Sequence, residues 1–250
     1  MNKLPDWFEI GEKLMKDISD AALIHADNLS DLEYDKKVSI QCSVYHYIQC
    51  LMSSIEENRI VNHAIALSTI RQSVEALTLI ECGFLKNRKL SDQLIDSWIS
   101  GKKTSGAIRK ILSQNIWPTY TKSLWGKNWT EYYSEFCKSI QPYAHYSREL
   151  QGWQLAINDN AKMNCNGHYV LNAKFGFNTY DSSKATRLTL FHVLLSWTLG
   201  KIITNNIEIP DLKKQLEQLQ IALELADELG KGKLSWAQQF WSLEFTKPVS

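Results

Sequence analysis

Apolar residues recur at intervals of three and four along most of the chain, which is the spacing of one face of an α-helix. We therefore predict an all-α protein, a multi-helix bundle whose helices turn their apolar faces to a common core. The pattern predicts helices over residues 6–28, 34–57, 60–84, 91–100, 105–114, 130–140, 182–204 and 211–229. In the second of these helices Val38, Cys42 and Tyr45 widen the apolar face, so we expect a broad contact with the core.

The helix predicted over residues 182–204 is expected to lie at the centre of the bundle. From Leu188 to Ile203 it is apolar on nearly every side, and a helix without a polar face is normally surrounded by protein. A membrane-spanning helix needs roughly 20 apolar residues with few charges. This run is shorter and contains His192 and Lys201, so we predict a buried helix and no membrane partner.

One stretch departs from the helical pattern. Residues 153–158 and 168–175 mix apolar and β-branched side chains around a polar turn, which is a hairpin signal. We predict a small β-hairpin insertion near 153–175. Because an isolated two-stranded hairpin is marginally stable, it should rest on the bundle.

The C-terminal segment, residues 231–250, is an amphipathic tail that contains Trp236, Phe240 and Trp241. It is expected either to close the core or to cover a partner. No repeat, low-complexity tract or clear linker divides the chain, so we assign residues 1–250 to a single helical domain.

Composition narrows the range of functions. The chain has 250 residues, 44% of them hydrophobic and 22% charged, which is ordinary for a globular protein. Its formal net charge of +1 provides no overall field that would attract nucleic acid. The N-terminus lacks the pattern of a signal peptide, so we expect a cytoplasmic protein. The five cysteines are scattered and never spaced as CxxC, which predicts reduced thiols.

The sequence lacks the motifs of several enzyme classes. The sequence contains no GxGxxG, no phosphate-binding loop ending in Lys-Ser/Thr, no GxSxG and no HExxH. The six histidines are far apart, and none lies four residues from another. We therefore expect neither a cofactor nor a metal.

Arg187 and His192 are the candidate catalytic residues, because a cation and a titratable ring inside an apolar helix each need a partner or a purpose. Their Arg-x4-His spacing resembles the signature of HEPN-type helical bundles, many of them bacterial ribonucleases of toxin-antitoxin and abortive-infection systems. The resemblance implies a homodimer that cleaves or binds RNA without a metal in bacterial defence. In that chemistry Arg187 would bind the phosphate and His192 would be the general acid or base.

The candidate binding residues lie in two other segments. Arg71 and Glu75 are four residues apart on a predicted helix and can pair. They form either a salt bridge at the edge of the core or part of a polar pocket in which Glu75 holds an arginine such as Arg187. His145, Tyr146 and Arg148 follow a helix break at Pro142, in the segment QPYAHYSRELQGWQ.

That segment, together with the run His63 to Phe84, also resembles a recurring type of bacterial protein of this size for which no activity is known. The alternative to an RNA-cleaving protein is a non-catalytic protein-interaction or scaffold bundle, with the hairpin and the aromatic tail as its contact surface. A locally basic segment is either a solvated face or a phosphate-binding surface. It contains Lys102, Lys103, Arg109, Lys110, Lys122 and Lys127.

Overall fold

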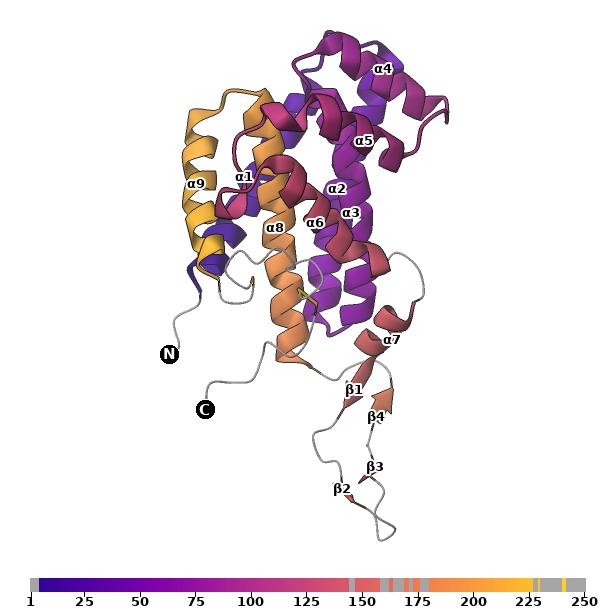
Figure 1. Ribbon diagram of the computed structural model, residues 1–250, viewed down its shortest axis with the longest axis vertical. Coiled ribbons are helices and arrows are strands. Elements are labelled where there is room, and N and C mark those ends of the chain that lie inside the picture. Colours follow the sequence, from indigo (N-terminus) through magenta and orange to yellow (C-terminus); the bar gives the residue numbers. More distant parts are fainter. Residues whose placement is uncertain are drawn as a thin grey trace.

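Nine α-helices make up most of the described chain, so the prediction of an all-helical bundle is confirmed (Figure 1). The computed structural model describes residues 5–143, 147–157, 162–163, 169–170, 173–175, 180–226, 229 and 240–241. The helices are α1 (Asp6–Asp27), α2 (Tyr34–Arg59), α3 (His63–Phe84), α4 (Arg88–Ile99), α5 (Ser105–Asn115), α6 (Trp129–Ile140), α7 (Arg148–Gln154), α8 (Ser182–Asn206) and α9 (Pro210–Glu224). Single 3-10 turns lie at η1 (Trp117–Thr119), η2 (Leu124–Gly126) and η3 (Gln141–Tyr143).

The helix α8 lies at the centre, as its sequence predicts. It packs against α1, α2, α3 and α9, and Figure 1 shows α9 on one side of it and α2 and α3 on the other. Its side chains from Leu190 to Gly200 are all buried, which explains why this helix has no polar face. Among the helices that the structure describes, none combines the length and apolar character needed to cross a bilayer.

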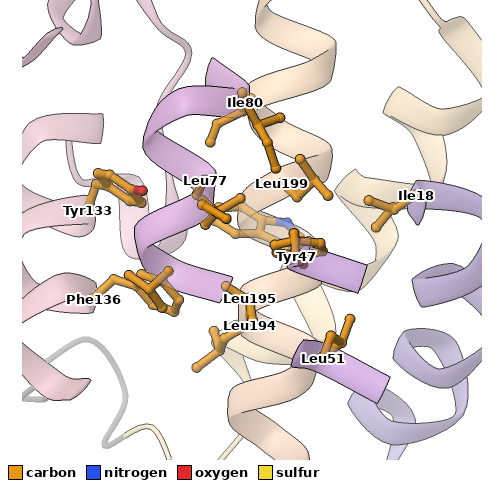
Figure 2. Packing of buried hydrophobic residues seen from close by; sticks show 14 of the residues in the cluster. Ile18, Tyr47, Leu51, Leu77, Ile80, Tyr133, Phe136, Leu194, Leu195 and Leu199 are labelled. Carbon is orange, nitrogen blue, oxygen red and sulfur yellow. The ribbon is translucent and has the colours of Figure 1, made fainter. Parts of the chain in front are cut away.

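Leucines of α8 form the middle of the core. Figure 2 shows Leu194, Leu195 and Leu199 among side chains from α1, α2, α3 and α6. Fully burying such a side chain contributes about 1.5–3 kcal/mol relative to leaving it exposed. The core is therefore stabilised mainly by the apolar side chains that neighbouring helices pack around α8.

Aromatic rings join α6 to α8. The rings of Phe136 and Phe191 stack with centroids 4.9 Å apart, and the Tyr132 hydroxyl lies 2.7 Å from the Thr198 hydroxyl. The aromatic pair of the C-terminal tail joins the same layer: Trp241 is buried and donates from Nε1 to the Ser139 carbonyl at 2.6 Å. The tail is expected either to close the core or to cover a partner. Its described residues, Phe240 and Trp241, pack into the core.

Only short strand pairings lie in the region of the predicted hairpin. The strand β1 (Leu155–Ile157) runs antiparallel to β4 (Ala173–Phe175), and β2 (Lys162–Met163) runs antiparallel to β3 (Tyr169–Val170). The first predicted strand, residues 153–158, begins two residues too early. Trp153 and Gln154 are the last residues of α7, and β1 begins at Leu155. The other residues of the predicted hairpin lie outside the described ranges. Pairings of two or three residues are too short to make a stable element of the fold.

The close approach of α8 to its neighbours depends on Gly200. A Cβ atom added at Gly200 would lie 2.7 Å from Leu216 Cδ2 on α9 and 3.2 Å from Ile18 Cδ1 on α1. Both distances are shorter than ordinary van der Waals contact between carbon atoms. A larger residue would therefore push α8 away from two helices at once.

We expect Gly200→Val to lower the free energy of unfolding by about 1–3 kcal/mol, since overpacking a core costs this much. Urea unfolding measures the change. Leu216→Ala in the Gly200→Val background should recover part of the loss, and Gly152→Val is the matched control because a Cβ there meets nothing within 4 Å. Equal losses at both glycines would contradict the close approach.

Candidate functional site

His192 is sealed between α8 and α2. Its side chain is 2% exposed, and its Nε2 lies 2.8 Å from Ser54 Oγ, which itself donates to the Ala66 carbonyl at 2.8 Å. Because the single hydroxyl proton of Ser54 is used on that carbonyl, Nε2 of the neutral ring must be the donor to Oγ. Burial lowers the pKa of His192 to about 3, so the ring is uncharged at neutral pH.

Arg187 connects α8 to the C-terminal aromatic pair. Its side chain is 1% exposed, and Nη1 donates to the backbone carbonyl of Phe240. The rings of Phe240 and Trp241 pack against Phe191 on α8, with centroids 5.7 Å and 5.1 Å away. The guanidinium therefore holds residues 240–241 in the aromatic layer.

The structure does not bring Arg187 and His192 together in one open site. Residues five apart on a straight helix point about 140° away from each other. Accordingly His192 bonds to α2, whereas Arg187 bonds to Phe240. Both side chains are buried, so neither the guanidinium nor the imidazole is open to a substrate from solvent.

Arg71 and Glu75 pair as their spacing on the helix predicts, with Nη2 and Oε1 3.0 Å apart. A second arginine joins them: Arg109 of α5 donates to Glu75 Oε2 at 3.1 Å and to Oε1 at 3.3 Å, and also to Thr78 Oγ1 at 3.1 Å. The suggestion that Glu75 holds Arg187 is therefore wrong, because the carboxylate is occupied by Arg71 and Arg109. All three charged side chains are partly exposed, so the cluster lies at the edge of the core.

Of the third predicted group, His145, Tyr146 and Arg148, only Arg148 lies within the described residues. Arg148 is the first residue of α7, and its side chain is exposed. His145 and Tyr146 lie outside the described residues. Within the described ranges, Arg148 makes no bond to the other predicted site residues.

Glu81 is a buried acid that the sequence analysis missed. It is completely buried on α3, its Oε1 accepts from Trp117 Nε1 at 2.9 Å, and the Tyr120 hydroxyl also bonds to the carboxyl group. Tyr120 in turn accepts from Asn206 Nδ2 at 2.7 Å, at the end of α8. Burial raises the pKa of Glu81 to about 7, against the lowering effect of these hydrogen bonds. The signal was present, since Glu81 is the one charge in the apolar run from Ala76 to Phe84.

An open groove of about 440 Å³ lies between α2, α3, α4 and the start of α5. Its size is within the range of small-ligand pockets. Apolar atoms make up most of its lining, and Trp98, which is 40% exposed, forms one wall. Its other lining residues include Val38, Cys42, His46, Ala76 and Leu79.

The outer face of α2, next to this groove, carries an uncharged stripe. No Asp, Glu, Lys or Arg occurs between Val38 and Ile55. We call Val38, Cys42, Tyr45, Gln49 and Met52 the α2 stripe; Val38 is half-buried, and the other four are exposed. Tyr45 and Met52 are each 58% exposed.

The prediction that Cys42 and Tyr45 widen the buried face of α2 is therefore wrong. Ile40, Val44 and Leu51 form the face that contacts the core. Positions 42 and 45 are rotated away from this face, because each residue advances about 100° around the helix. The apolar character of α2 thus extends beyond what the core of this chain can cover.

Within the described ranges, no three His, Cys, Asp or Glu side chains lie close enough together to bind a metal ion. Comparison with protein-family models, with curated proteins and with solved structures finds no match to this chain.

His192 and Glu81, which are both buried, predict opposite effects of pH on stability. Folding lowers the pKa of His192 from 6.5 to about 3, so its contribution to stability rises as pH increases between these values. Folding raises the pKa of Glu81 from 4.5 to about 7, so its contribution falls as pH increases. The two effects offset each other between about pH 4.5 and 6.5.

Replacing either Glu81 or His192 should leave the pH dependence of the unfolding free energy that is due to the other. Relative to wild type, the unfolding free energy of Glu81→Gln should rise by about 3 kcal/mol from pH 4.5 to 6.5, and that of His192→Gln should fall by about as much. Urea unfolding at a series of pH values measures both slopes. Variants whose slopes match that of the wild type would contradict the burial of these groups.

Proposed function

We propose that the chain is a non-catalytic protein-interaction bundle that binds a partner protein through the outer face of α2. The α2 stripe is the observation that carries this proposal. Soluble proteins usually intersperse charges over an exposed helix face, whereas the centres of protein interfaces lack charge and are enriched in Tyr and Met. An exposed helix face with Tyr45 and Met52 and no charge over several turns fits an interface.

The adjoining groove supports the same surface. Binding energy concentrates where an anchoring side chain fills a desolvated pocket. The groove borders Cys42 and Trp98, so a partner that covers the stripe can insert an apolar side chain there. Glu75, which lines the groove and is bonded to Arg71 and Arg109, supplies a polar margin.

The positions of Arg187 and His192 favour structural roles over catalysis. A general acid or base works best with a pKa near the operating pH and within hydrogen-bond reach of its substrate. His192 is buried and has a pKa of about 3. Arg187 is bonded to the Phe240 carbonyl. Each group joins α8 to another part of the chain, which is a sufficient reason for its presence.

The locally basic segment gives little support to RNA binding. Arg109, a half-buried residue of this segment, is engaged by Glu75 through two hydrogen bonds. Phosphate-binding proteins depend on several cations that are available to the backbone. The HEPN-like ribonuclease remains the alternative, carried by the spacing of Arg187 and His192 in the sequence.

An RNA-cleavage assay separates the two functions. We expect the purified wild-type chain and His192→Ala to leave single-stranded and structured RNA equally intact, because the ring has no access to substrate. Cleavage by the wild type that His192→Ala abolishes, with Glu81→Gln active as a control for folding, would overturn the non-catalytic assignment.

Photo-crosslinking tests the interaction surface directly. A photoreactive phenylalanine analogue at position 45 should yield protein adducts in cells, and the same analogue at position 225 should yield few. Leu225 is the matched control, since it is 74% exposed and lies just after α9, far along the chain from α2. Mass spectrometry identifies whether the adduct is another copy or a different protein. Absence of adducts at position 45 would refute the proposed surface.

A further inference from the structure

We infer that the partner on this face is a second copy of the same chain, bound by antiparallel packing of α2 against α2 about a two-fold axis. This inference rests on the proposed function and names its partner. The argument comes from three properties of α2: the spacing of its exposed residues, their lack of charge and the charges that flank them.

The exposed residues follow the spacing of a coiled-coil seam. The α2 stripe alternates steps of four and three residues, and the same spacing continues to Asp35 at one end and to Glu56 and Arg59 at the other. This is the a/d pattern of a heptad repeat, which brings one side of a helix against a second helix along its length. Except for half-buried Val38, every residue of this seam is exposed in the single chain. The inner face of α2 is occupied by the core, so the seam is a second contact face.

The absence of charge permits the helix to meet its own copy. In a two-fold contact the same patch occurs on both sides, so charges of one sign near the axis would repel each other. The α2 stripe contains no charged side chain, and this obstacle is therefore missing. A strongly acidic or basic partner would find no complementary charge on the stripe.

The ends of the helix favour one register. Cys42 and Met52 are equally distant from Tyr47 along the chain, and so are Asp35 and Arg59. A two-fold axis that crosses the outer face of α2 at the level of residue 47 therefore places Cys42 opposite the partner's Met52. The same axis places Asp35 opposite the partner's Arg59, and by symmetry this ion pair forms twice. Both side chains are exposed, and within the described part of its own chain Arg59 is paired with Glu56, 3.6 Å away.

The groove suits the residue that this register brings to it. Cys42 lines the groove, so the partner's Met52 would enter it. Methionine is flexible and apolar, and it fills irregular apolar space well. Close to the axis, Tyr45 would lie opposite the partner's Gln49, where hydroxyl and amide groups can bond. The contact thus has apolar anchors on both sides of a polar centre.

Sedimentation velocity of the purified full chain tests the association. We expect a monomer–dimer equilibrium in the micromolar range, and Met52→Glu should weaken it at least tenfold because the new carboxylate would enter the groove. Leu225→Glu is the matched control and should leave the equilibrium unchanged. A chain that stays monomeric at 100-fold higher concentrations, on the order of 100 μM, would overturn the inference.

A charge exchange tests the register. Asp35→Arg and Arg59→Asp should each weaken the dimer several-fold, since each places like charges opposite each other at both ends. The double variant Asp35→Arg, Arg59→Asp should return to within about threefold of wild type. A dimer that tolerates all three variants, or a double variant that is no better than the single ones, would overturn the antiparallel register.

A disulfide provides a second measure of the same register. With dissolved oxygen as the oxidant that accepts the two electrons and two protons, the Met52→Cys thiol should form a disulfide with Cys42 of the partner subunit, giving a reducible dimer, and the added substitution Cys42→Ser should remove it. No difference between these two variants would count against the register. If the chain is monomeric while position 45 crosslinks to a different protein in cells, self-association fails and the proposed function stands. If position 45 also yields no adduct, both fail.

Discussion

The enclosure of α8 on every side is the constraint on which the rest of the structure depends. A helix with no face left to water must find a partner inside the protein for each polar group it carries, because an unpaired buried polar group costs on the order of 1–3 kcal/mol. His192 reaches Ser54, Thr198 reaches Tyr132, and Asn206 reaches Tyr120. These bonds determine where α2, α6 and the segment after η1 lie around the helix.

This constraint explains why the most suggestive residues of the sequence have structural roles. Arg187 and His192 are conspicuous because they interrupt an apolar helix, and the same burial that makes them conspicuous also separates them from solvent. Their bonds join α8 to Phe240 and to α2. Glu81 does the same on α3, where it joins the core to Trp117 and Tyr120. The buried polar groups of this protein thus connect elements that apolar contacts alone would leave free to slide.

The α2 stripe, whose lack of charge the core does not explain, lies on the opposite side of α2 from this core. One face of the helix completes the bundle through Ile40, Val44 and Leu51, while the other carries an uncharged stripe that nothing in the described chain covers. The bundle covers the first face, and under our proposal a second copy of the chain covers the other.

The sequence by itself determined the local features of this protein: its helices, the central position of α8 and the pairing of Arg71 with Glu75, because each follows from the spacing of residues along a few helical turns. Only the tertiary structure decided which residues meet across long separations. Arg109 binds Glu75 from 34 residues away, Phe240 binds Arg187 from 53, and Ser54 binds His192 from 138. It also decided that Cys42 and Tyr45 face water, since the exposure of a helix face depends on how many neighbours pack around it. No periodicity within α2 contains that information.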